Sequence, residues 1–285
     1  MSSATQIVTE KPKFSHFIFL PPGQVFRGGA PGVYAVRYYS NPGNIRSNYA
    51  IRRLMHNERA KEHYHNFFAP LLMEHGFEGH YLQKTGEKRE GCAIFYRRAV
   101  FEELDYRHVD LFASEDSTLD KPNVAQLIRL RHIHSKKEIC IANTHLVFNK
   151  KYGAKKFAQT ALILAHLRSF IQKGRPAEYL LCGDFNIEPF SDVYRFILEG
   201  RLDLQQCVDV LMSGQGGQLR KEPTPPQMDI PEAMALKQDC TLAKKGEKFA
   251  YEGSAWSHQQ RFASAYHHLP FAFNPFAITQ VLLVR

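Results

Sequence analysis

An apolar run over residues 179–182 ends abruptly in Gly183-Asp184-Phe185-Asn186. A bounded apolar run of this length fits a buried strand. The glycine gives the backbone room to turn, so the strand end presents a carboxylate and an amide side by side. Two interpretations fit these residues equally well. They form either the active-site end of an α/β sheet, where polar groups follow a strand, or an Asx-rich turn that only connects the strand to the next helix.

A second strand end of the same kind lies upstream. The apolar residues 139–142 lead into Asn-Thr and then His145, and a helical pattern over residues 155–172 separates the two strand ends. A helix of crossover length predicts neighbouring strands whose ends lie on the same side of one sheet. His145, Asp184 and Asn186 would then reach one substrate. A lone histidine is more often a hydrogen-bonded core residue, but the pairing with the second strand end favours a functional role.

The chemistry of these three side chains points to a phosphoryl group. A histidine can donate a hydrogen bond to phosphate or move a proton, and a carboxylate can hold a metal ion or orient an attacking water. An amide can bind a phosphoryl oxygen.

Composition narrows the class of protein. The chain has 285 residues, of which 44% are hydrophobic, enough for one large domain or two small ones. No apolar run approaches the roughly 20 residues that span a bilayer, so we expect no membrane segment. The five scattered cysteines form no CxxC pair and predict buried, reduced thiols in an intracellular protein. We expect a cytoplasmic protein, with the nucleus and the mitochondrion left open.

The charge is compatible with a nucleic-acid partner. The formal net charge is +9, which permits attraction to a polyanion such as RNA, although an ordinary basic surface explains it equally well. Residues 11–57 contain no Asp or Glu and several Gly and Pro residues. We therefore predict a basic, irregular leader over residues 1–57 and a folded domain over residues 58–285.

Several ordered motifs lie at residues 85–96, 119–125, 143–149, 157–159, 183–186 and 193–202. Together they resemble the endonuclease/exonuclease/phosphatase superfamily, and within it the Angel branch, which is related to nocturnin and the Ccr-type deadenylases. The resemblance spans roughly residues 58–268, and the number and order of the motifs make it specific.

The resemblance implies a fold and a chemistry. The fold is a two-sheet α/β sandwich flanked by helices, and the activity is Mg²⁺-dependent cleavage of phosphoester bonds in RNA. His145 matches the family's phosphate-contacting histidine, and Asp184 matches the aspartate that positions the attacking water. Asn186 matches the asparagine that contacts the scissile phosphate.

Three further residues have weaker matches. Glu58 falls on the position of the Mg²⁺-binding glutamate, but its flanking residues differ, and an exposed helical carboxylate is the alternative. Asn123 and Asn149 are candidates to line the substrate site, and hydrogen bonding in a turn or at a strand end is the alternative for both.

The chain departs from the family pattern at both ends. No strand with an early active-site asparagine precedes Glu58, and the family's Asp-Tyr strand and terminal Ser-Asp-His motif do not follow residues 264–268. We therefore expect a fold that is incomplete at both ends, with a C-terminally truncated domain and low or no activity. The expected function is that of a 3′-end exoribonuclease of the deadenylase type or an RNA 2′,3′-cyclic phosphatase. The alternative is a non-catalytic module that binds RNA or protein, and the sequence identifies no protein partner.

Overall fold

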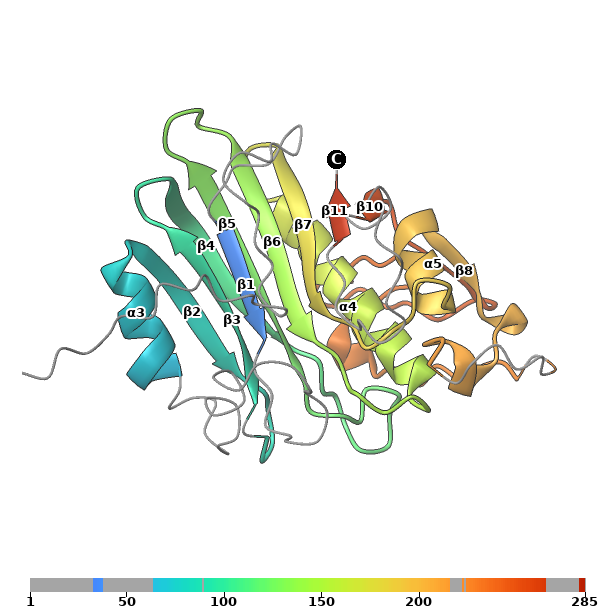
Figure 1. Ribbon diagram of the computed structural model, residues 1–285. Helices are drawn as coiled ribbons and strands as arrows, with labels where there is room; N and C mark the ends of the chain where they lie inside the picture. Colours follow the sequence, from blue (N-terminus) through green and yellow to red (C-terminus); the bar gives the residue numbers. More distant parts are fainter. Residues whose placement is uncertain are drawn as a thin grey trace, which may run out of the picture.

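The computed structural model describes residues 64–88, 90–215, 222 and 224–264, together with the backbone of two strands at residues 33–37 and 282–284 (Figure 1). Glu58 lies outside the described residues. No helix in the described part of the chain has the length and apolar character that crossing a membrane requires.

Two β-sheets form the body of the molecule (Figure 1). The larger sheet contains, in spatial order, β10 (Phe262–Ser264), β11 (Leu282–Val284), β7 (Ala177–Asp184), β6 (Glu138–His145), β5 (Val124–His132) and β4 (Phe101–Asp110). The smaller sheet contains β1 (Val33–Arg37), β3 (Gly91–Arg97) and β2 (Phe77–Gln83), and a separate pair joins β8 (Arg201–Asp203) to β9 (Ala255–Ser257). β1 lies within the predicted leader and pairs antiparallel with β3.

One helix packs on the larger sheet and connects β6 to β7, a second packs against that helix, and a third packs on the smaller sheet. The long helix is α4 (Gly153–Ile171), and the shorter ones are α3 (Ala69–Glu74) and α5 (Asp192–Glu199). A π-helical turn lies at Tyr64–Phe68, and 3₁₀ turns lie at Leu204–Gln206, Asp209–Leu211 and Glu232–Met234. The predicted two-sheet sandwich flanked by helices is confirmed, and α4 occupies the predicted crossover.

The larger sheet is buried on both faces, because a different layer packs on each. Successive residues of a strand point to opposite faces. Leu127 and Ala142 belong to the core beneath α4, whereas their neighbours Ile128 and Ile141 belong to a second core that includes Ile94 of the smaller sheet. This arrangement explains why β5 and β6 are near-continuous apolar runs rather than alternating ones.

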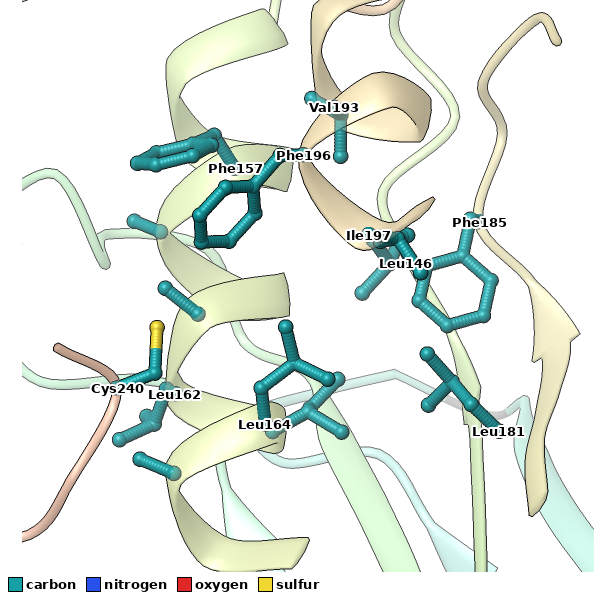
Figure 2. Packing of buried hydrophobic residues seen from close by; sticks show 14 of the residues in the cluster. Leu146, Phe157, Leu162, Leu164, Leu181, Phe185, Val193, Phe196, Ile197 and Cys240 are labelled. Atoms are coloured by element: carbon teal, nitrogen blue, oxygen red, sulfur yellow. The ribbon is translucent and has the colours of Figure 1, made fainter. Parts of the chain in front are cut away.

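The core beneath α4 also fixes α5. Phe157 of α4 packs against Phe196 of α5, with ring centroids 4.8 Å apart (Figure 2). Ser191 caps the start of α5 by accepting a hydrogen bond from the Tyr194 N–H, and Gly200 ends the helix in the left-handed conformation. Phe185, which follows β7, points into the same core as Leu181 (Figure 2).

A buried arginine joins the sheet to the end of α4. Arg129 of β5 donates from Nε to Glu138 Oε2 at 2.7 Å and from Nη1 to the Phe170 carbonyl at 3.1 Å. It also donates to the carbonyls of Ile171, Lys173 and Arg175. The last carbonyls of a helix lack partners within the helix and carry partial negative charge, so this guanidinium satisfies them and complements the helix dipole.

We predict that Arg129→Met lowers the free energy of unfolding by about 3–5 kcal/mol. It leaves several carbonyls without their partner, and it leaves the buried Glu138 carboxylate with only the 3.3 Å contact to Arg131. Urea titration measures the loss. Arg195→Met is the control, because Arg195 pairs with Asp192 at the surface and its loss costs less than about 1 kcal/mol. Equal losses in the two variants would contradict the role of Arg129.

Candidate active site

The parallel pairing of β6 and β7 brings the two predicted strand ends together. His145 lies opposite Asp184 in the register of the two strands, and Thr144 lies opposite Gly183. The sequence-based prediction that both strand ends lie on the same side of one sheet is therefore confirmed.

Gly183 is required by the closeness of the two backbones. Its φ is +128°, and a Cβ atom at this position would lie 2.0 Å from the Thr144 carbonyl oxygen. No side chain fits at that distance, and residues other than glycine rarely adopt this φ. The close approach in turn lets the Leu146 N–H donate to the Asp184 carbonyl at 2.8 Å.

Asp184 is fully buried at the end of β7, and its Oδ1 accepts a hydrogen bond from the Asn186 N–H at 2.8 Å. This hydrogen bond is an Asx turn, so the turn considered above as an alternative is present. Burial raises the pKa of Asp184 to about 8, although the Asn186 N–H opposes the shift.

Asn186 is also fully buried and has a φ of +50°, in the left-handed region that asparagine tolerates better than most residues. Its Nδ2 donates to the Leu146 carbonyl at 2.8 Å. Its Oδ1 is buried and accepts no hydrogen bond from any described residue. Buried polar atoms normally have a partner, and this oxygen is one of several described atoms without one, Gln260 Oε1 and His258 Nδ1 included. It is available for a further hydrogen bond.

His145 lies beside a carboxylate to which the sequence pattern assigned no role. His145 is 3% exposed, and its Nδ1 lies 3.9 Å from Oε2 of Glu90, which precedes β3. The other oxygen of Glu90 accepts from Lys84 Nζ at 2.9 Å, and the Lys84 side chain is itself buried. The 3.9 Å separation is too long for a hydrogen bond, so Glu90 acts on His145 through its charge, which favours a proton on Nδ1.

The two candidate lining residues make hydrogen bonds within the chain. Asn123 is buried, and it donates to Gln159 Oε1 at 3.0 Å and accepts from the Val124 N–H at 2.9 Å. Asn149 is exposed, and its Oδ1 accepts from the Lys151 N–H in the turn before α4. Both side chains thus make the strand-end or turn hydrogen bonds that were the alternative, and their roles toward substrate stay predictions.

Lys156 is a further residue near the site that the sequence pattern did not reveal. Its side chain is fully buried in the first turns of α4, and Nζ donates to the Asn186 carbonyl and to Gln215 Oε1, both at 2.7 Å. Burial lowers the pKa of Lys156 to about 7, against the opposing influence of the Glu188 carboxylate.

Residues 22–269 match the endonuclease/exonuclease/phosphatase family. The chain belongs to this family. It is 32% identical over 235 residues to protein angel homolog 2 of Danio rerio, and the alignment covers 74% of this chain and 40% of the relative. It is 34% identical over 163 residues to protein angel homolog 2 of Homo sapiens, covering 55% of this chain and 30% of the relative.

A solved structure of the Angel branch has the same fold. The crystal structure of ANGEL2, a 2′,3′-cyclic phosphatase, in complex with adenosine-2′,3′-vanadate superposes with a TM-score of 0.67 and 27% identity, over 79% of this chain and 68% of that chain. The resemblance to the Angel branch is thus confirmed. The chain spans 30–40% of the length of the two curated relatives, and the division at residue 57 stays a prediction.

The metal that the family uses is compatible with the oxygen atoms of this site. Mg²⁺ prefers oxygen ligands and needs only one or two carboxylates, with water and substrate phosphate completing its shell. Among the described residues, no three His, Cys, Asp or Glu side chains gather in a group that could hold a metal ion. The predicted ligand Glu58 lies outside them, and Asn186 Oδ1 is an oxygen of the kind that a hard cation prefers, in a fully buried side chain.

We predict that Gly183→Ala lowers the free energy of unfolding by about 2–5 kcal/mol, because it combines a strained φ with a clash against backbone. Gly246→Ala is the matched control, since Gly246 has a φ of +84° and a Cβ atom placed there would have no neighbour within 4 Å, so only the conformational cost of about 1–2 kcal/mol applies. Denaturant titration of both variants measures the difference. Similar losses would show that the two strand ends are not in close contact.

We predict that the stability difference between Asp184→Asn and the parent chain depends on pH. The folded-state pKa of Asp184 is about 8, above its unfolded-state pKa of about 3.9. The protonated Asp184 side chain therefore contributes its full stabilisation at pH values below about 3.9. This stabilisation is lost as pH rises toward 8. The melting temperature of Asp184→Asn minus that of the parent, measured in EDTA, should therefore become more positive from pH 5 to pH 8.

Asp203→Asn is the control for this experiment. Hydrogen bonds from the Ser254 hydroxyl and the Gln205 N–H lower the pKa of Asp203, so Asp203 titrates below this pH window. The melting temperature of Asp203→Asn minus that of the parent should therefore stay constant from pH 5 to pH 8. A constant difference for Asp184→Asn as well would mean that Asp184 is already ionised in the folded chain at pH 5.

Proposed function

We propose that the chain is a phosphoesterase that opens 2′,3′-cyclic phosphates at RNA ends, with Mg²⁺ as its metal. The observation that carries the proposal is the burial of Asp184 and Asn186 beside His145 at the paired ends of β6 and β7. The similarity to ANGEL2, described as a 2′,3′-cyclic phosphatase and solved with adenosine-2′,3′-vanadate, supports this substrate class.

Each polar residue has a role that its surroundings support. The reaction adds water to phosphorus and breaks one P–O bond of the ring, and the proton of the water ends on the released ribose oxygen. Asp184 orients the water and accepts its proton, for which a pKa near the working pH is suited. Asn186 Oδ1 accepts a hydrogen bond from the same water, since no described residue occupies that oxygen.

His145 contacts the phosphoryl oxygens. With one proton on Nδ1 beside Glu90, the imidazole donates to a phosphoryl oxygen from Nε2 in its doubly protonated form. Lys84, bound to the other Glu90 oxygen, keeps that carboxylate in place. A bound Mg²⁺ would neutralise the negative charge of the phosphoryl group.

Two other functions are distinguishable from this one. The deadenylase-type exoribonuclease shortens an oligoadenylate with a free 3′-hydroxyl, whereas a cyclic phosphatase leaves it at full length. A non-catalytic module, which the net charge of +9 favours, binds RNA in a salt-dependent way and hydrolyses nothing.

We predict Mg²⁺-dependent hydrolysis of an RNA with a 2′,3′-cyclic phosphate end, and a loss of kcat of about 100-fold or more in Asp184→Ala, which is typical for removal of a general base. Conversion of the cyclic end to a monophosphate is measured with and without EDTA, and a 3′-hydroxyl oligoadenylate is measured in parallel. The control is Asp239→Ala, because Asp239 is exposed and its carboxylate accepts a hydrogen bond from the hydroxyl of its near neighbour Thr241.

The outcomes separate the candidates. Shortening of the oligoadenylate assigns the exoribonuclease. RNA binding that persists in Asp184→Ala and without Mg²⁺, in the absence of hydrolysis, assigns the binding module. The same assay measures the low turnover expected from the sequence, which stays a prediction.

A further inference from the structure

Lys156 is a charged side chain in the interior of the protein, with a head group that bonds only to neutral oxygens among the described residues. Its Nζ donates to the Asn186 carbonyl and to the Gln215 side chain. Lysine is almost never fully buried unless it is paired, because removing an ammonium from water is costly. Because burying this lysine opposes folding, its presence indicates a role in the neighbouring site.

The ammonium contacts the backbone of Asn186 from outside the two strand ends. The Asn186 N–H donates to Asp184 and its side chain donates to the Leu146 carbonyl, both within the strand ends themselves. Lys156, on α4, donates to the Asn186 carbonyl. A residue with φ of +50° is held in a sparsely populated conformation, which persists only where its surroundings fix it.

Lys156 also connects the segments that surround the site. Lys156 donates to the side chain of Gln215, which lies two residues after Ser213. The Ser213 carbonyl accepts a hydrogen bond from the Glu188 N–H at 2.8 Å. The Ser213 hydroxyl donates to the Lys150 carbonyl at 3.1 Å. The loops after β6 and after β7 are thus tied to one another and to α4 by hydrogen bonds that meet near a single ammonium group.

We propose that Lys156 is a positioning residue for the reaction at this site: it fixes the Asn186 peptide, and through it the relative placement of Asp184 and the Asn186 side chain. The expected effect of Lys156 on kcat rests on the proposed function. Its expected effect on the structure of the strand ends rests on the hydrogen bonds alone. Lys156 touches neither the substrate nor the reacting atoms.

The kinetic test compares Lys156→Met with the parent chain on adenosine 2′,3′-cyclic phosphate, a substrate too small to report on RNA binding elsewhere. Methionine keeps the shape and removes the buried charge. We expect kcat to fall about 10-fold or more, as small displacements of catalytic groups do, with KM changed by less than about 3-fold, because the ground-state contacts remain.

The matched control is Lys155→Met. Lys155 is the adjacent residue on the same helix, but its side chain is 24% exposed and pairs with Asp120 at 2.6 Å. We expect the parent kcat in this variant. In Lys156→Ala, ethylammonium should restore part of the lost kcat, whereas ethanol at the same concentration should not, because only the cation replaces the missing group.

A second measurement does not depend on activity. Hydrogen exchange of the backbone amides of residues 184–188 should be faster in Lys156→Met and unchanged in Lys155→Met. Melting temperatures are recorded alongside, and because burial of an ammonium opposes folding we expect the Lys156→Met value to stay within ~5 °C of the parent.

The outcomes decide between a positioning and a merely structural role. Parent-like kcat with parent-like exchange overturns the proposal, and so does a fall in kcat that follows a general loss of folding or is not rescued by the amine. If the parent chain hydrolyses no cyclic phosphate, the proposed function fails separately. Local acceleration of exchange at residues 184–188 then still supports the role of Lys156, and its absence overturns it.

Discussion

The close contact between the backbones at the ends of β6 and β7 is the constraint on which the candidate site depends. It needs a glycine at position 183 because any Cβ would meet the Thr144 carbonyl. It places His145 beside Asp184 in register and lets the Asn186 side chain reach the Leu146 carbonyl. The side chains of Asp184 and Asn186 are therefore ordered by hydrogen bonds to main-chain groups, which the strand pairing holds in place. Such preorganisation is what a site needs in order to stabilise developing charge without rearranging.

The same burial that orders the site makes it costly to fold. Burial favours the neutral forms of both buried groups, because it raises the pKa of Asp184 and lowers that of Lys156. Around neutral pH both groups are close to the point where they gain or lose a proton. Stability and the proposed reaction consequently have opposite requirements at Asp184. Its protonated form favours folding, whereas the proposed general base is its ionised form. Arg129, which satisfies the end of α4 elsewhere in the fold, contributes stability that can offset this cost.

The parts of the site that could be predicted from the sequence are those with local signals. Apolar runs ending in polar residues identified both strand ends, and helical periodicity identified the crossover, so their juxtaposition followed from the rules of parallel sheets. Glu90 and Lys156 had no such signal. Glu90 approaches His145 only because the smaller sheet packs on the larger one. Lys155 and Lys156 are neighbours of identical type, and α4 is buried around most of its first turns, so helical phase alone does not tell which lysine is inside.

The two interpretations of Gly183-Asp184-Phe185-Asn186, an active-site strand end and a connecting Asx turn, describe the same local geometry. The hydrogen bond from the Asn186 N–H to Asp184 Oδ1 makes the turn, and it also fixes the carboxylate that the proposed reaction uses. The two buried asparagines differ in how their side-chain oxygens are used. Asn123 uses its amide fully within the described residues, donating to Gln159 and accepting from Val124, whereas buried Asn186 Oδ1 accepts nothing from them. Other buried atoms, Gln260 Oε1 and His258 Nδ1 among them, are in the same state. The open oxygen of Asn186 therefore supports the proposed reaction through its position beside Asp184, at the paired ends of β6 and β7.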